Sequence, residues 1–228
     1  AISQHTKNDI IKYYGISASK VSVIYQSCAE TFKTKVSSSG IQRVLQSHHL
    51  PSEYMLYVGS IIERKNLLLL VEALAMLPRN IKIPLVVIGQ GKGSYYKKVK
   101  SFIHKYGLAS RVFFPKGITN EELPAIYQGA QLFCYVSAYE GFGIPILEAL
   151  YSKVPVLTSK SSALPEAAGE GAFYVEDISA QAIASQMEVA LIDEQRRRVA
   201  IEKGNAHTAV FDAEKLTAEM MGLYEGIV

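Results

Sequence analysis

The 228-residue sequence has few of the residues that build metal sites. It contains two cysteines and five histidines. Cys28 and Cys134 lie far apart without metal-ligand spacing, and no two histidines form a His-x-x-x-His pair. We therefore predict no metal site. The two cysteines also indicate a reducing compartment, and we expect a cytoplasmic protein.

The sequence also lacks long apolar runs and a strong charge imbalance. Apolar runs such as 67–71 and 132–136 are far too short to span a bilayer. The formal net charge is +3, which gives no sign of the basic face that nucleic-acid-binding proteins usually have. With 49% hydrophobic residues and a mean hydropathy of +0.11, the chain is predicted to be globular, without a nucleic-acid partner. No signal peptide is expected.

Short apolar runs alternate with amphipathic segments from residue 54 onward. Strands are predicted at 55–58, 85–88, 112–114, 132–136, 154–157 and 172–175. Helices are predicted at 67–77, 95–106, 121–128, 146–151, 180–192 and 193–203, with a short turn at 165–168. Strict alternation and near-continuous apolar strands are typical of parallel sheets that are buried on both faces. We therefore predict an α/β fold with a Rossmann-like, doubly wound parallel sheet.

The first fifty residues have a different pattern. Thr6 is a candidate N-cap for a helix that ends at Gly15, and 21–25 is predicted to be a strand. The polar, serine-rich stretch 33–40 is predicted to be a loop or linker. Because so short a piece cannot bury its own faces, we interpret 1–50 as the end of another domain whose beginning is absent.

Capping signals support the later boundaries. Thr119 is followed three residues later by a glutamate, which predicts a capping box before the next helix. Asp212 is placed to cap a last helix that extends to about Tyr224. We assign 51–205 to the sheet domain and 206–228 to a C-terminal segment that contains this helix.

Residues 140–148, Glu-Gly-Phe-Gly-Ile-Pro-Ile-Leu-Glu, are the most informative stretch of the chain. Proline after a Gly-Phe-Gly turn is typical of the first turn of a helix, where its missing N–H costs nothing. The glycines let backbone N–H groups converge at the helix N-terminus, where an anion is favoured. Glu140 precedes this turn and Glu148 follows within the helix. Two carboxylates around an anion-binding turn suit a ligand with phosphates and sugar hydroxyls, such as a nucleotide sugar.

A second informative loop follows the first predicted strand. Residues 59–66 read Gly-Ser-Ile-Ile-Glu-Arg-Lys-Asn and precede a predicted helix. Ligands of open parallel sheets bind beyond the carboxyl ends of the strands, where Arg64 and Lys65 are expected to lie. The two cations suit a diphosphate, because Arg grips oxygens in a bidentate manner and Lys adds a compact charge.

Three further loops are candidates for smaller roles. The glycine-rich stretch 88–94 has the spacing of neither a dinucleotide fingerprint nor a P-loop, so a ligand loop and a plain tight turn both stay open. The stretch 114–118 ends the third predicted strand and faces the same crevice. In 161–169, Glu166 is better interpreted as a capping or buried, paired acid than as a catalytic group.

These motifs resemble those of the retaining, GT-B-fold glycosyltransferases of family four. Residues 140–148 look like the family's Glu-x7-Glu motif, and 59–66 resemble its Gly-Thr-x-Glu-Pro-Arg-Lys-Asn motif, with Ser60 in place of Thr. The stretches 114–118 and 161–169 resemble its Phe-x-Gly-x-Val and Ser-x-Leu-Pro-Glu-x-x-Gly segments. The four motifs occur in the family's order, and the resemblance covers almost the whole chain.

The resemblance implies the donor-binding half of a hexosyltransferase that uses a nucleoside-diphosphate sugar, UDP or GDP, without a metal or other cofactor. Arg64 and Lys65 would neutralise the departing diphosphate, and Glu140 would hydrogen-bond the transferred sugar. The residues implied to bind the donor are Gly59, Ser60, Gly117, Ile118, Gly141, Phe142, Gly143, Ile144 and Glu148. Within this set, Glu148 would bind the ribose hydroxyls, and the backbone of Gly117 and Ile118 the nucleobase.

The resemblance also implies partners. Residues 1–50 would be the end of the acceptor domain with its linker, 51–205 the donor-binding domain, and 206–228 a helix that packs back towards the acceptor domain. Ala213 departs from the family there, since relatives often have Trp. A saccharide or lipid-linked acceptor of cell-surface polysaccharide or glycolipid synthesis would bind the missing domain, which would also mediate any peripheral contact with the inner face of the cell membrane. We expect this fragment to bind nucleotide and transfer no sugar.

Three alternatives remain open at this point. A nucleotide-sugar 2-epimerase shares the fold and would be distinguished by extra catalytic acids in a complete N-terminal domain. A non-catalytic nucleotide-sugar-binding module is disfavoured, because all four charged residues of the two main motifs are intact. An NAD-dependent oxidoreductase is disfavoured because the first strand–helix turn has one glycine and two cations where a glycine-rich pyrophosphate turn is needed.

Overall fold

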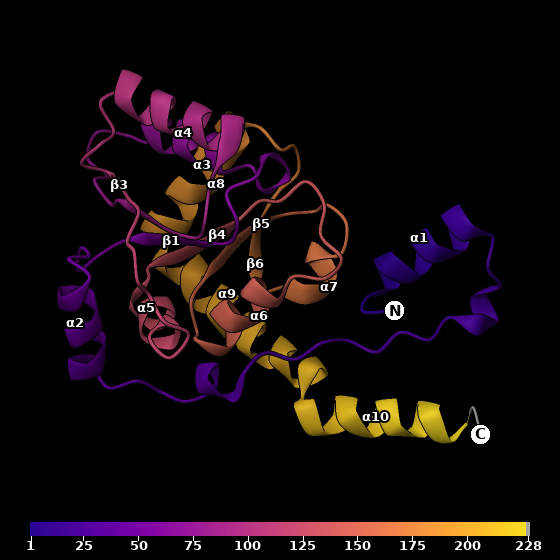
Figure 1. The fold of residues 1–228 in the computed structure, drawn as a ribbon. Coiled ribbons are helices and arrows are strands. Elements are labelled where there is room, and N and C mark those ends of the chain that lie inside the picture. The colour runs from indigo at the N-terminus through magenta and orange to yellow at the C-terminus, as the bar shows by residue number, and fades with distance from the viewer. Residues whose placement is uncertain (227–228) are drawn as a thin grey trace.

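The centre of the molecule is a six-stranded parallel β-sheet, in a computed structural model that describes residues 1–226. The strands are β1 (Met55–Val58), β2 (Leu85–Ile88), β3 (Val112–Phe113), β4 (Leu132–Tyr135), β5 (Val156–Ser159) and β6 (Ala172–Val175). Their order across the sheet is β3-β2-β1-β4-β5-β6, and all neighbours are parallel (Figure 1). This order is that of doubly wound nucleotide-binding folds, and the predicted fold class is confirmed.

Helices cover both faces of the sheet (Figure 1). One face packs against α3 (Leu67–Met76), α4 (Gly93–Lys105) and α8 (Ala180–Ile192). The other packs against α2 (Ser38–Ser47), α5 (Leu123–Gly129), α6 (Ile144–Tyr151) and α7 (Leu164–Ala168). In β1, Met55 and Tyr57 join the first layer and Leu56 joins the second, and all three are fully buried. Burial on both sides is why the strands are continuously apolar.

Strand β5 is displaced by two residues from its predicted position at 154–157. Two polar residues form its end, because each finds a buried hydrogen-bond acceptor. The Thr158 hydroxyl donates to the carbonyl of Tyr135 at 2.7 Å, and the Ser159 hydroxyl donates to the carbonyl of Ser137 at 2.8 Å. Apolar content alone therefore locates this strand incorrectly.

The N-terminal region differs most from the prediction. Helix α1 (Gln4–Tyr14) is capped by Ser3, whose side chain accepts the N–H of Thr6, so Thr6 is not the N-cap. The strand predicted at 21–25 is wrong, because this segment joins no sheet in the described structure. Its Ile24 N–H instead donates to the carbonyl of Ala1 at 3.0 Å.

Two further helix starts correct the prediction. The predicted linker 33–40 contains the beginning of α2, because Ser37 caps that helix through its hydroxyl. Helix α5 begins at Leu123 rather than at 121, and Pro124 occupies its first turn. The capping box is half formed: the carboxylate of Glu122 accepts the N–H of Thr119 at 2.9 Å.

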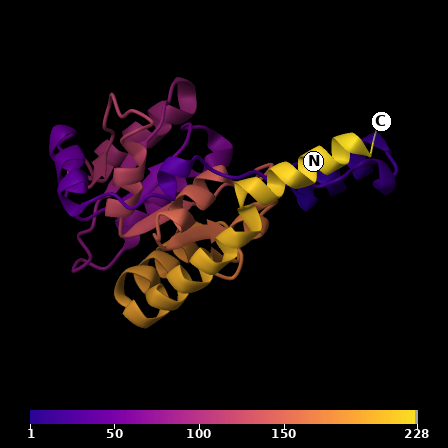
Figure 2. The same cartoon turned by 90° about the horizontal axis from the view of Figure 1, so that it is seen from below.

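The C-terminal part consists of α9 (Glu194–His207), a 3₁₀ helix η4 (Thr208–Phe211) and α10 (Ala213–Glu225). Asp212 caps α10 by accepting the N–H of Lys215 at 3.0 Å, as predicted. Helix α10 and the N-terminal segment project together from one side of the sheet domain (Figures 1 and 2). The last two residues of the predicted segment 206–228 lie outside the described residues. The other 3₁₀ helices are η1 (Ala18–Lys20), η2 (Glu30–Phe32) and η3 (Glu63–Lys65).

Candidate functional site

The strand order reverses between β1 and β4, which lie side by side in the sheet (Figure 1). In open α/β sheets, ligands bind at this place, beyond the carboxyl ends of the strands. Strand β1 leads into η3, and β4 leads into the loop that contains Glu140 and then into α6. The two most informative motifs of the sequence therefore meet at the switch point of the fold.

The loop after β1 is fixed to the loop after β4 by hydrogen bonds. Asn66 adopts a left-handed conformation with φ 55°, and its side-chain amide donates to the carbonyl of Val136 at 2.8 Å. The carbonyl of Arg64 accepts the N–H of Ala138 at 2.7 Å. These bonds hold the cationic loop against the loop that leads to the Gly-Phe-Gly turn.

Both predicted cations bind Glu140. One nitrogen of Arg64 lies 2.7 Å from its Oε1, and the Nζ of Lys65 lies 2.9 Å from the same oxygen. Lys65 is only 7% exposed, and its ammonium also donates to the hydroxyl of Tyr135. That hydroxyl in turn donates to Glu140 Oε1 at 3.0 Å. A buried ammonium requires such a partner, and the structure brings the three predicted catalytic residues together.

The pKa values follow from this pairing. Burial raises the pKa of Glu140, but the hydrogen bonds from Arg64 and Lys65 outweigh it, and the pKa lies below its ordinary value. The hydrogen bond to Glu140 is the main cause of a raised pKa of Arg64. Burial, followed by the charge of Glu140, raises the pKa of Tyr135. Glu140 is therefore ionised and a weak base, and Tyr135 is a neutral hydrogen-bond donor.

The Gly-Phe-Gly turn begins α6 next to this cluster. Gly143 is the N-cap with φ 139°, a conformation that favours glycine, and Pro145 lies in the first turn, as predicted. Within residues 1–226, no side chain caps this helix start. The first N–H groups of α6 lie at the positive end of the helix dipole, where an anion is favoured.

Helix α1 supports the same turn from the outside. The carbonyl of Gly141 accepts hydrogen bonds from the hydroxyls of Ser3 at 2.7 Å and Thr6 at 3.0 Å. The buried ring of Phe142 stacks on Tyr25, with ring centroids 5.6 Å apart. Sequence reasoning missed Ser3, Thr6 and Tyr25, because these contacts join distant parts of the chain and no local pattern marks them.

Glu166 connects α7 to the start of α1. Its two oxygens accept the backbone N–H groups of Gln4 at 2.7 Å and His5 at 2.8 Å. The hydroxyl of Tyr25 donates to the same carboxylate at 3.1 Å. A carboxylate is favoured at a helix N-terminus. The prediction that Glu166 is a capping acid is confirmed, although the helix that it caps is α1 and not its own.

Glu148 lies in a different environment from Glu140. It projects from α6 and accepts a hydrogen bond from the hydroxyl of Tyr127 at 2.7 Å. Burial raises its pKa, which the hydrogen bond from Tyr127 lowers only in part, so the pKa stays above its ordinary value. Among residues 1–226, no lysine or arginine pairs with this carboxylate.

Glycines at the ends of β1 and β2 allow two loops to approach closely. A Cβ on Gly59 (φ 152°) would lie 3.3 Å from the side chain of Lys65. A Cβ on Gly89 (φ 157°) would lie 1.9 Å from the carbonyl oxygen of Gly59, which no side chain permits. The close packing of the two loops therefore explains why residue 89 is a glycine. Ser60, in the loop after β1, is exposed, and its carbonyl accepts a hydrogen bond from the hydroxyl of Tyr57 at 2.9 Å.

Gly117 and Ile118 follow β3, at the edge of the sheet. Gly117 has φ 73°, and Ile118 packs against the buried layer that contains α5 and α6. Strand β2 separates β3 from β1, so these residues lie two strands away from the cationic cluster. They lie at the same carboxyl edge of the sheet as Arg64, Lys65 and Glu140, but they are not part of that cluster.

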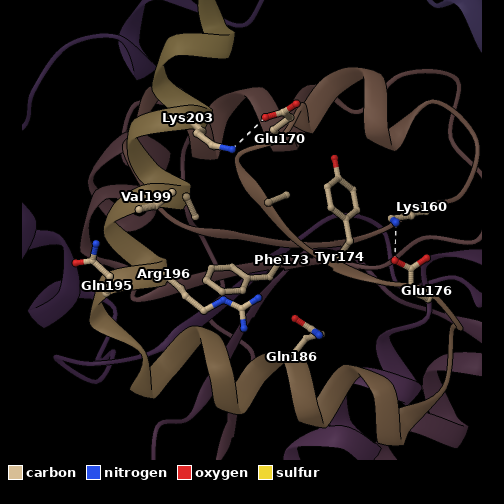
Figure 3. Close-up of a pocket in the computed structure, with 12 residues that line it drawn as sticks. Lys160, Glu170, Phe173, Tyr174, Glu176, Gln186, Gln195, Arg196, Val199 and Lys203 are labelled. Carbon is tan, nitrogen blue, oxygen red and sulfur yellow. Dashed lines mark hydrogen bonds and ion pairs between the residues drawn. The ribbon is translucent and has the colours of Figure 1, made fainter.

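A separate hollow of about 480 Å³ lies at the opposite edge, between β6, α8 and α9 (Figure 3). Lys160 pairs with Glu176 at 2.5 Å, and Lys203 pairs with Glu170 at 3.0 Å. None of the predicted site residues lines it. Because no motif found in the sequence contributes to it, we assign no ligand to this hollow.

The described residues contain no alternative metal or thiol site. Over 1–226, no three His, Cys, Asp or Glu side chains gather where they could hold a metal ion. Cys28 and Cys134 are free and buried, and burial raises the pKa of Cys28 to about 11. Over the same residues, no helix combines the length and apolarity needed to cross a bilayer.

Comparison with known proteins gives the family. The family model for group 1 glycosyl transferases matches residues 42–207, well over half of the chain. The O-antigen chain mannosyltransferase B of Escherichia coli is 28% identical over 227 residues, which cover 98% of this chain and 59% of that protein. The serotype-specific mannosyltransferase WbdA of Escherichia coli is 32% identical over 200 residues, which cover 85% of this chain and 24% of that protein. The chain thus spans less than two thirds of either relative.

Solved structures share the fold. Anabaena Alr3699/HepE in complex with UDP and glucose has a TM-score of 0.87 at 22% identity, covering 99% of this chain and 62% of that chain. WaaG, a glycosyltransferase involved in lipopolysaccharide biosynthesis, has a TM-score of 0.78 at 22% identity, covering 93% and 58%. The family model covers all six strands of this chain and the two motifs at the switch point. The chain belongs to the group 1 glycosyl transferases.

Proposed function

We propose that this chain is the donor-binding half of a retaining hexosyltransferase that uses a nucleoside-diphosphate sugar. The observation that supports it most is the cluster of Arg64, Lys65 and Glu140 at the switch point, beside the start of α6. The names of the relatives favour mannose as the hexose and O-antigen-like surface polysaccharide as the product. UDP in the HepE complex is consistent with a nucleotide donor in this fold.

The leaving group is the part of the donor that the site can stabilise. When the bond from the anomeric carbon to the diphosphate breaks, its electron pair goes to the phosphate oxygen. Arg64, Lys65 and the backbone N–H groups at 141–144 stabilise that charge. Each fixed donor of this kind contributes about 2.7–4 kcal/mol to transition-state stabilisation. Because these groups supply the positive charge, we propose a reaction that needs no metal cofactor.

Glu140 holds the transferred sugar in this proposal. Its lowered pKa makes it a poor general base, and its carboxylate is suited to accept hydrogen bonds from sugar hydroxyls. The acceptor hydroxyl attacks the anomeric carbon on the face from which the diphosphate leaves, which retains the configuration. The proton of that hydroxyl passes to the departing phosphate oxygen.

The remaining donor contacts follow the sheet edge. Glu148, with its raised pKa and no cationic partner, suits neutral ribose hydroxyls. The backbone of Gly117 and Ile118, two strands away, suits the nucleobase at the far end of the ligand. Gly59 and Ser60, which follow β1, also contact the donor in this proposal. A side chain on Gly59 would crowd Lys65.

We further propose that residues 1–50 are the end of an acceptor domain with its linker, and that 51–205 form the donor domain. Residues 206–228 would then pack back towards the acceptor domain. Ile24 and Tyr25 line one hollow together with Leu216 and Met220 of α10, which supports a shared surface. A saccharide or lipid-linked acceptor, and any contact with the inner face of the cell membrane, would involve that domain.

Titration calorimetry with UDP, GDP and ADP tests the donor site directly. We expect one nucleotide to bind with a clear preference, which also identifies the base. The Lys65→Ala variant should lose this binding, whereas Lys97→Ala, on the exposed side of α4, should retain it. If none of the three nucleotides binds, the proposed function is wrong.

A further inference from the structure

In this structure, the cations proposed to bind the diphosphate are already occupied by a carboxylate. Arg64 and Lys65 both contact the same oxygen of Glu140, at 2.7 and 2.9 Å. The carboxylate is itself largely buried, with a side-chain exposure of 12%. Where two anions would share one small cationic site, each strongly disfavours the other.

From this geometry we infer that Glu140 is an internal competitor of the diphosphate, which makes the site prefer an intact nucleotide sugar to a free nucleoside diphosphate. The inference rests on the proposed function and concerns the regulation of the same site. A diphosphate can reach Arg64 and Lys65 fully only when the Glu140 side chain moves off them. The protein must therefore break two ion pairs whenever a diphosphate binds.

The sugar of an intact donor offsets that cost. Its hydroxyls can donate hydrogen bonds to the displaced carboxylate, so Glu140 exchanges cationic partners for neutral donors. A free nucleoside diphosphate has no sugar and leaves Glu140 without that exchange. After transfer, the carboxylate returns to the cations and favours release of the product.

The surroundings of Glu140 fit a side chain that switches while its backbone stays in place. The N–H of Glu140 donates to the hydroxyl of Ser162 at 2.8 Å, which anchors the main chain. The hydroxyl of Tyr135, at the end of β4, also donates to the carboxylate. Without Glu140, Lys65 would be an unpaired, buried ammonium, so the carboxylate also stabilises the ligand-free protein.

Glu140→Gln is the decisive variant, because it removes the charge and keeps the shape. We expect it to bind the preferred nucleoside diphosphate, and inorganic pyrophosphate, at least about tenfold more tightly than the wild type in calorimetry. Its ratio of affinities for the intact donor over the free diphosphate should fall. Equal or weaker binding of both diphosphates by Glu140→Gln would overturn the inference.

Glu148→Gln is the matched control, since it makes the same change eight residues further along, at a carboxylate without a cationic partner. It should not tighten pyrophosphate binding. If Glu148→Gln tightens it as much as Glu140→Gln, general charge removal is the cause and the inference fails. If the wild type binds a nucleotide and Glu140→Gln binds it no better, the inference fails and the proposed function stands. If neither protein binds any nucleotide, both fail.

Two further measurements keep the inference testable if Glu140→Gln folds poorly. Pyrophosphate should raise the melting temperature of Glu140→Gln more than that of the wild type, because it restores a partner to Lys65. Glu140→Asp keeps the charge but is one methylene shorter, so it cannot hold both cations at 2.7 and 2.9 Å. We expect its diphosphate affinity to lie between those of the wild type and Glu140→Gln, and an unchanged affinity would contradict the competition.

Discussion

The two carboxylates at either end of the Glu-x7-Glu motif show how one helix start can present two chemically different acids. Each accepts a hydrogen bond from a buried tyrosine, Tyr135 for Glu140 and Tyr127 for Glu148. Glu140 also binds two cations, and its pKa is lowered. Glu148 has no cationic partner in the described structure, and burial raises its pKa.

The two environments differ in charge: Glu140 has cationic partners, whereas Glu148 has only a neutral hydrogen-bond donor. Around Glu140, the protein concentrates full charges, which suit the diphosphate of the proposed donor. Around Glu148, it provides one neutral donor and partial burial, which suits hydroxyl groups. The identity of the residue is the same in both places, so the neighbours decide the role. Five substitutions, grouped in four tests, break or sharpen this contrast, beginning with the largest expected effect.

Removal of Lys65 tests the cationic end. In the complete enzyme, Lys65→Ala should lower turnover by about 100-fold or more, because a fixed donor to the leaving group contributes about 2.7–4 kcal/mol. The measurement is steady-state kinetics of sugar transfer, with Lys97→Ala as a control on the exposed side of α4. A fall of less than tenfold would exclude Lys65 from the leaving-group site.

Removal of the Glu140 charge tests the stability of the same end. Glu140→Gln should lower the free energy of unfolding at pH 7 by roughly 2–4 kcal/mol, since Lys65 loses its ion pair while Arg64 is about half exposed. A lowered native pKa stabilises the fold above the ordinary carboxyl pKa, and this contribution is lost as the pH falls through the native value. Urea unfolding at pH 7 and pH 3 should therefore show a smaller difference between the two proteins at pH 3. The same difference at both pH values would argue against an ionised Glu140.

The two tyrosines allow a matched comparison. Tyr127→Phe should destabilise the protein by about 1–2 kcal/mol, because Glu148 loses the donor that keeps its pKa from rising further. Tyr135→Phe should cost less, since Glu140 keeps Arg64 and Lys65. Chemical denaturation of both variants at pH 7 makes the comparison, and the opposite order would show that the cations do not dominate at Glu140.

Neutralisation of Glu148 should have the smallest effect on stability. A raised native pKa means that stability falls as the pH rises from the ordinary carboxyl value through the native one, so ionised Glu148 is destabilising at pH 7. Glu148→Gln should thus raise the melting temperature at pH 7 by roughly 1–3 °C and weaken nucleotide binding. A lower melting temperature, measured by calorimetric scanning, would show that the carboxylate is not strained by burial.

Much of the sheet domain was predictable because its signals are local. Strands β1, β2 and β6 form where apolar runs predict them, since parallel strands are buried on both faces. The cationic loop and the Gly-Phe-Gly turn follow neighbouring strands, so topology alone brings them to one edge. The close approach of Arg64 and Lys65 to Glu140 was therefore within reach of sequence reasoning.

Contacts made by partners distant in sequence were not predictable. Nothing near residues 21–25 shows that this segment lacks a sheet neighbour, and β-branched residues there resemble a strand. In the sequence, Tyr135 is indistinguishable from the other apolar residues of its strand, although its hydroxyl bonds both Lys65 and Glu140. Ser3 is a common N-cap, and its second role at Gly141 depends on how α1 packs on the domain.

The two hydrogen bonds to the carbonyl of Gly141 couple the position of α1 to the turn before α6. A trans peptide unit points its carbonyl and the following N–H in opposite directions, so a carbonyl clamped by Ser3 and Thr6 fixes the aim of the Phe142 amide. Glu166 holds the beginning of the same helix at two amides. A tilt of α1 would therefore rotate that peptide plane and change the direction of the Phe142 N–H.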